Sequence, residues 1–104
     1  MSHQAAAKED FKIIECGEVL DISVTAELRT QLLTVLESKK SVMLDASQVE
    51  RADTAALQVL SAFVQDANSQ QQTVQWKKPS EALFRSAELL GLSGLLKLTT
   101  NQAE

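Results

Sequence analysis

Strand-like and helix-like patterns alternate along this chain, and that alternation most constrains how it can fold. Short runs rich in β-branched and other apolar residues occur at 11–14, 19–22, 42–44 and 73–76. Apolar patterns with helical spacing separate the last three of these runs. A strand–helix–strand–helix–strand order favours parallel strands, because each helix carries the chain back to the same end of the sheet. The sequence therefore predicts an α/β domain.

The first two strand-like runs lie close together, on either side of a turn that contains Gly17. Because so few residues separate them, they predict an antiparallel hairpin. Added to the parallel strands, this hairpin gives a four-stranded mixed sheet packed by three to four helices. Right-handed crossovers between strands in sequence order would place both crossover helices on the same face of the sheet.

Polar residues mark where the three main helices are expected to begin. Thr25, Asp53 and Ser80 each precede a helical pattern. Side chains of these types accept hydrogen bonds from the free N–H groups of a first helical turn, and we interpret Asp53 mainly as such a cap. The first helix is expected to end near Lys39, and Gly91 suits the position just after the third helix.

Length and composition predict one domain with an aliphatic core. The chain has 104 residues, of which 44% are hydrophobic but only 4% aromatic. We expect a flexible N-terminal tail at residues 1–9, the folded domain at 10–99, and a C-terminal tail at 100–104.

Charge and residue inventory argue against several classes of function. A net charge of −4 is unsuited to nucleic-acid binding, which needs a clustered positive field. No run of eighteen apolar residues and no signal-peptide pattern occurs, so we expect no membrane insertion and a cytoplasmic location. His3 is the only histidine and Cys16 the only cysteine, which leaves no Ser–His–Asp or Cys–His site and few metal ligands. We therefore expect no enzyme activity, no cofactor and no metal.

Three segments carry a recognisable pattern. Residues 17–28 contain Gly-Glu-Val-Leu-Asp and then Thr-Ala-Glu-Leu; residues 45–57 contain Asp-Ala-Ser-Gln-Val and then Asp-Thr-Ala-Ala-Leu; residues 89–92 are Leu-Leu-Gly-Leu. This pattern resembles the STAS domain, a family named for sulfate transporters and anti-sigma-factor antagonists. The resemblance covers residues 11–98 and implies a single small α/β domain that binds a protein partner.

One position departs from that family's pattern. In anti-sigma-factor antagonists, the second hydroxyl residue of the central motif accepts phosphate, and here that position is Ala55, which has no hydroxyl. Thr54 retains the first hydroxyl position and is a possible phospho-acceptor. Its place at a helix start suits a phosphate or a partner carboxylate.

The predicted partner surface lies at the carboxyl ends of the parallel strands, where α/β folds usually place their binding loops. It combines the loop before the second crossover helix, the start and exposed edge of that helix, and two lysines after the last strand. That helix has more apolar residues than a core-facing stripe of about 100° requires. The predicted partner-binding residues are Ser47, Gln48, Asp53, Thr54, Ala55, Gln58, Lys77 and Lys78.

The function expected from these features is a non-catalytic regulatory module, similar to an anti-sigma-factor antagonist or to bacterial STAS proteins associated with chemotaxis and signalling. One alternative is the STAS subunit of a lipid-transport ABC ATPase complex, which the Asp53-Thr54-Ala55 segment also resembles. Another is a sensor that binds a nucleotide or lipid at the strand ends. The expected partner is an anti-sigma-factor kinase, a chemotaxis component or an ABC ATPase, bound by a monomer or weak homodimer.

Overall fold

The alternation of strands and helices appears in the computed structural model, which describes residues 11–98. The predicted tails at 1–9 and 100–104 lie outside the described residues. In chain order the elements are β2 (Lys12–Glu15), β3 (Val19–Leu20), α2 (Ile22–Ser38), β4 (Val42–Asp45), β5 (Arg51–Ala52), α3 (Thr54–Ser69), β6 (Val74–Lys77), α4 (Glu81–Leu89) and α5 (Ser93–Leu96).

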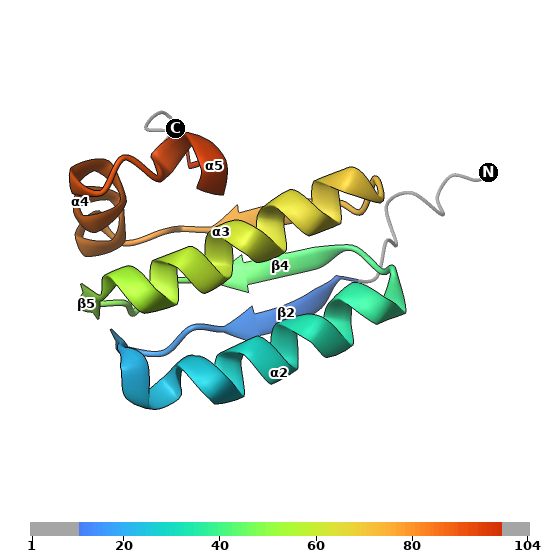
Figure 1. Cartoon of the computed structure of the whole chain (residues 1–104), viewed down its shortest axis with the longest axis horizontal. Coiled ribbons are helices and arrows are strands. Elements are labelled where there is room, and N and C mark those ends of the chain that lie inside the picture. The colour runs from blue at the N-terminus through green and yellow to red at the C-terminus, as the bar shows by residue number, and fades with distance from the viewer. Residues whose placement is uncertain (1–10, 99–104) are drawn as a thin grey trace.

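Strands β2, β4 and β6 form a parallel sheet with β4 in the centre. Leu44 of β4 pairs with Ile14 on one side and Trp76 on the other. Helices α2 and α3 lie side by side across one face of this sheet, as predicted (Figure 1). Helix α4 lies near the start of α3, and α5 packs alongside α3, where the Gln65 side chain donates to the Leu95 carbonyl at 2.9 Å (Figure 1). The described residues thus contain four helices.

The predicted antiparallel hairpin is wrong, and so is the single four-stranded mixed sheet that included it. β3 pairs in parallel with β5 and forms a separate two-stranded sheet. The physical reason lies in the intervening turn: Cys16 continues the pairing with β4 by donating its N–H to the Asp45 carbonyl, and Gly17 then turns the chain with a φ of +81°. This left-handed conformation suits glycine and directs Val19 and Leu20 away from β2.

The start of α2 also differs from the prediction. The helix begins at Ile22, and its cap is Asp21 rather than Thr25. Ile22 was expected to end a strand because it alternates with Leu20. The carboxylate of Asp21 instead accepts a hydrogen bond from the Ser23 N–H at 2.9 Å, which closes the first helical turn around Ile22.

The other helix boundaries agree better with expectation. The Ser80 hydroxyl accepts a hydrogen bond from the Leu83 N–H at 3.1 Å and caps α4 as predicted. Asp53 precedes α3 as predicted, but its side chain makes no capping hydrogen bond, so that interpretation of Asp53 is wrong. Lys39 ends α2 and Gly91 follows α4, both with positive φ angles.

The core is mainly aliphatic, with Phe63 as a buried aromatic side chain, and lies between the three-stranded sheet and its covering helices. The strand residues that face the helices alternate with residues that face away, as strand geometry requires. The indole N–H of Trp76 donates to the Leu96 carbonyl at 2.9 Å and attaches α5 to β6. The largest fully buried side chains are Leu20, Val42, Leu44, Leu57, Leu60, Val64, Leu83 and Leu96.

Ser61 of α3 carries the buried side-chain polar atom that lacks a hydrogen-bond partner within residues 11–98. We expect Ser61→Ala to raise the free energy of unfolding by about 1 kcal/mol, because it removes a buried polar group that lost its water contacts. Urea denaturation measures this change. Ser80→Ala is the matched control and should lower the free energy of unfolding by about 1 kcal/mol, because it deletes a helix cap. Equal destabilisation by both substitutions would contradict the assignment of Ser61.

Candidate functional site

A groove lies beside the first turn of α3. Asp53, Thr54 and Ala55, three of the predicted site residues, form one wall of it. The groove has a volume of about 580 Å³. Its remaining lining comes from segments distant in sequence: Ile22 of α2, Ala52 of β5, Ser86 and Leu89 of α4, and Leu90 after α4.

The groove is bordered by large aliphatic side chains that water reaches. Ile22 is 76% exposed and Leu89 is 81% exposed, and Leu90 is also exposed. Contiguous exposed apolar side chains with a polar border mark interaction sites more often than ordinary surface. Four lining residues were not predicted from the sequence: Ile22, Ser86, Leu89 and Leu90. Residue type alone does not tell whether an aliphatic side chain will be exposed at a groove or buried in the core.

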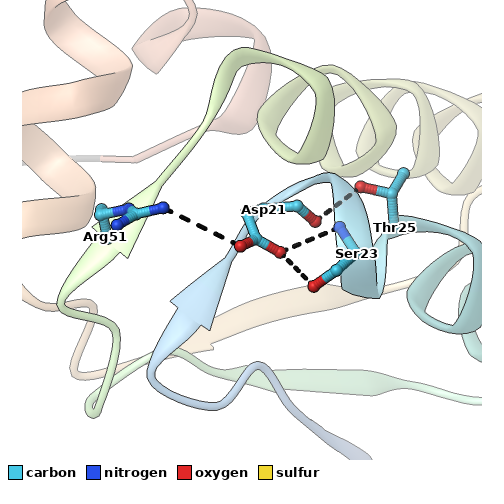
Figure 2. A network of polar contacts seen from close by, with 4 residues as sticks. All are labelled: Asp21, Ser23, Thr25 and Arg51. Atoms are coloured by element: carbon cyan, nitrogen blue, oxygen red, sulfur yellow. Dashed lines mark hydrogen bonds and ion pairs between the residues drawn. The ribbon is translucent and has the colours of Figure 1, made fainter.

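A polar network holds the two chain segments that lead into this groove (Figure 2). The Asp21 carboxylate accepts hydrogen bonds from the N–H and the hydroxyl of Ser23, at 2.9 and 2.6 Å. The Thr25 hydroxyl donates to the Asp21 carbonyl at 2.9 Å. Arg51 of β5 lies 3.9 Å from the same carboxylate. The network therefore joins the start of α2 to β5, and β5 leads directly into Asp53 and α3.

The hydrogen bonds from Ser23 are also the main reason that the pKa of Asp21 is lowered from its ordinary value, and the positive charge of Arg51 adds to the effect. Asp21 is therefore a carboxylate at neutral pH. Asp53 follows at the head of α3, and its N–H donates to the Leu20 carbonyl at 2.8 Å, next to Asp21 in the chain. Of these two acidic residues, Asp53 lines the groove and Asp21 does not.

The polar groups at the start of α3 are available to a partner. Within residues 11–98, no hydrogen bond or ion pair occupies the side chain of Asp53 or Thr54. The first helical hydrogen bond runs from the Leu57 N–H to the Asp53 carbonyl at 3.0 Å. The N–H groups of the first turn therefore point outward from the helix end, as at any helix N-terminus without a side-chain cap.

Comparison with known families decides the classification of this arrangement. The family model described as "Mlab, STAS domain" matches residues 3–98. The chain belongs to the STAS domain family. A search of curated proteins found no match. Membership agrees with the α/β architecture and supports a regulatory module that acts by protein–protein interaction. Within the described range, no helix of this STAS domain is long and apolar enough to cross a membrane.

The STAS domain does not bring all eight predicted site residues together. Ser47 donates its N–H and its hydroxyl to the Asp45 carboxylate, at 3.1 and 2.7 Å. Lys77 lies opposite Asp45 in the sheet, on the face turned away from α3. Neither Ser47 nor Lys77 lines the groove beside α3, and the same holds for Gln48 and Lys78.

The remaining predicted residue, Gln58, lies on a different side of α3. It lines a second groove, between α2 and α3, and Ala55 borders both grooves. The predicted residues thus do not form one continuous surface, and only Asp53, Thr54 and Ala55 share the groove with the exposed aliphatic side chains.

The described part of the STAS domain offers few reactive side chains. Cys16 is buried, and burial raises the pKa of its thiol to about 12, with a further contribution from the charge of Asp45. This thiol is therefore protonated and unreactive at neutral pH. The Asp45 carboxylate has a lowered pKa because Ser47 donates to it and Lys77 lies near. Among residues 11–98, no cluster of three or more histidine, cysteine or acidic side chains could hold a metal ion.

Proposed function

We propose that this STAS domain is a non-catalytic regulatory module that binds a protein partner through the groove at the start of α3. The observation that carries the proposal is the exposure of Ile22 and Leu89 in the same groove as the unpaired side chains of Asp53 and Thr54. A cytoplasmic location suits partners of the kind that the family resemblance implies.

Energetics favour a macromolecular partner over a small ligand at this groove. Full burial of a leucine or isoleucine side chain contributes about 1.5–3 kcal/mol. Leu89 and Ile22 belong to two different helices, so one small molecule would leave much of their apolar surface exposed to water. A protein surface can cover both and can also satisfy the polar groups of Asp53 and Thr54. The lining contains no histidine and no cysteine, which is why the proposal excludes nucleophilic catalysis there.

Two kinds of partner fit the family resemblance. The first is an anti-sigma-factor kinase or a chemotaxis component, as for regulatory STAS proteins. The second is the ATPase of a lipid-transport ABC complex. Ala55 supports the second candidate specifically, because a permanent subunit needs no phosphate acceptor at that position, whereas a serine-controlled antagonist does.

The substitution Leu89→Ser tests the proposal. We expect it to weaken partner binding at least tenfold, or about 1.4 kcal/mol, because it deletes an aliphatic side chain that the partner would cover. Isothermal titration against a purified anti-sigma-factor kinase and a purified ABC ATPase gives the affinities. The domain should stay folded, because Leu89 is 81% exposed at the end of α4.

Ile13→Ser is the matched control. Ile13 is 58% exposed, but it lies on β2 and outside the groove, so its replacement should leave the affinity within about twofold. Wild-type affinity for Leu89→Ser, or equal weakening by both substitutions, would place the partner surface elsewhere.

A further inference from the structure

The groove at the start of α3 continues into the second groove, because Ala55 lines both. The second groove lies between α2 and α3, has a volume of about 370 Å³ and is lined mainly by apolar side chains. The two helices lie next to each other and run in the same direction (Figure 1). Their side chains in the two grooves, together with Asp53, form what we call the α2–α3 trough.

The trough runs along the helix axes. Its lining residues are three or four positions apart on each helix, which places them on one helix face. On α2 they include Ile22, Thr25, Arg29, Leu33 and Leu36, and on α3 they include Ala55, Gln58, Ala62 and Asp66. Leu33 is 49% exposed and Ala62 is exposed as well, so the trough offers apolar surface to a ligand.

Three charged residues line the trough: Asp53, Arg29 and Asp66. Within residues 11–98, none of their side chains forms an ion pair or a hydrogen bond. Arg29 and Asp66 are exposed, and Asp53 is half-buried. A ligand with complementary charges can therefore pair with them without breaking an existing contact.

These charges follow one another at regular intervals. The two helices end at the same level, where the Gln70 side chain after α3 donates to the Leu36 carbonyl at 2.9 Å. Measured back from that level at about 1.5 Å of rise per residue, Asp53 lies at about 24 Å, Arg29 at about 14 Å and Asp66 at about 5 Å. Along the trough the charges are therefore negative, positive and negative, at intervals of about 9–10 Å.

We propose that the partner inserts an amphipathic α-helix into the α2–α3 trough, which rests on the proposed function and adds the segment that binds. Seven residues of an α-helix make two turns and rise about 10.5 Å, so residues at that interval share one face. A basic, an acidic and a basic residue at these intervals meet Asp53, Arg29 and Asp66 in turn. Apolar residues one turn from each charge lie on the same face and cover Leu33.

The charge order and its interval favour a helix of a different chain over other occupants. Negative, positive, negative reads the same in both directions, so two copies of the trough placed face to face in register would oppose like charges. An extended strand rises about 3.3 Å per residue, so the interval between charges corresponds to about three residues. Alternate strand side chains point to opposite faces, and successive charges of a strand would therefore point away from the trough in turn.

Two synthetic helical peptides test the proposal against the full chain. Both carry leucines at the same positions of one face. The first peptide has lysine, glutamate and lysine at the proposed intervals, and the second has glutamate, lysine and glutamate. Fluorescence anisotropy of the labelled peptides measures both affinities. The first peptide should bind at least tenfold more tightly, because all three of its charges meet opposite charges. Leu33→Ser should weaken its binding, because the substitution removes apolar contact area.

Charge reversal in the domain locates the bound peptide. Arg29→Glu should weaken binding of the first peptide at least fivefold, and a third peptide with lysine at its centre should recover that loss. Arg85→Glu is the matched control, because it changes the net charge equally but lies outside the trough, where Arg85 pairs with Glu81. This control should keep the preference of the wild-type chain for the first peptide.

The proposal would be overturned if the first two peptides bind equally, if neither binds at about 1 mM, or if Arg29→Glu and Arg85→Glu have the same effect. Leu89 belongs to α4 and lies outside the trough, so the partner titration with Leu89→Ser tests the proposed function separately. Weaker partner binding by Leu89→Ser, combined with peptides that bind equally, would keep the proposed function and exclude the helix.

Discussion

Leu44→Ala is expected to lower the free energy of unfolding by about 2–5 kcal/mol, because truncating a buried leucine removes its transfer free energy and leaves a cavity. Leu44 is fully buried at the centre of the parallel sheet, with Ile14 and Trp76 as its cross-strand neighbours. Strands on both sides and helices above limit how far the surroundings can close around the lost atoms. Urea denaturation followed by far-UV circular dichroism measures the change.

Ile13→Ala is the control for this prediction, because Ile13 points to the opposite face of the same sheet and is 58% exposed. Its cost should stay below about 1 kcal/mol, as for most surface substitutions. If the two substitutions cost the same, β4 does not lie at the centre of the core.

Phosphorylation by an anti-sigma-factor kinase is expected to be absent in the wild-type chain and present in the Ala55→Ser variant. Alanine offers no oxygen to accept phosphate, whereas the substitution places a hydroxyl in the first turn of α3, where a phosphate is favoured by the helix N-terminus. The neighbouring Thr54 is β-branched, which restricts its side-chain rotamers, and we expect it to remain unmodified. Incubation with kinase and ATP followed by intact-protein mass spectrometry counts the phosphates.

Thr54→Ala, alone and combined with Ala55→Ser, locates any phosphate that appears. A phosphate on the wild-type chain that disappears in Thr54→Ala would show that Thr54 is the acceptor. A failure of Ala55→Ser to accept phosphate would show that this groove does not engage that kinase, which leaves the ABC ATPase as the partner to test.

Much of the fold could be predicted because local signals and core packing agreed. Ser80 has the side chain that a helix start needs and Gly91 suits the conformation that follows a helix end, and both positions were found. The first strands were mispredicted because proximity in sequence suggested a hairpin. The actual pairing joins segments that are distant in sequence: β2 pairs with β4, and β3 pairs with β5.

The site was predicted less completely than the fold. Asp53, Thr54 and Ala55 were found because a helix start after a strand carries a local pattern and a family resemblance. Ile22 and Leu89 were missed because their importance depends on exposure, which follows from how α2 and α4 pack. Lys77 was predicted as a site residue because the carboxyl ends of parallel strands lie at the same edge of the sheet. Side chains alternate along a strand, however, and Lys77 lies on the face of the sheet away from α3.

The separate pairing of β3 with β5 has a consequence for how the domain can respond to a partner. Only two residue pairs join these strands, Val19 with Arg51 and Leu20 with Ala52, whereas β4 is paired along its full length on both sides. The segment that leads into the groove is therefore held by fewer residue pairs than the central strand. Segments with few backbone hydrogen bonds open at a lower free energy than the whole domain. Leu20 of β3 is fully buried, so a rearrangement of the binding surface moves one side chain of the hydrophobic core with it.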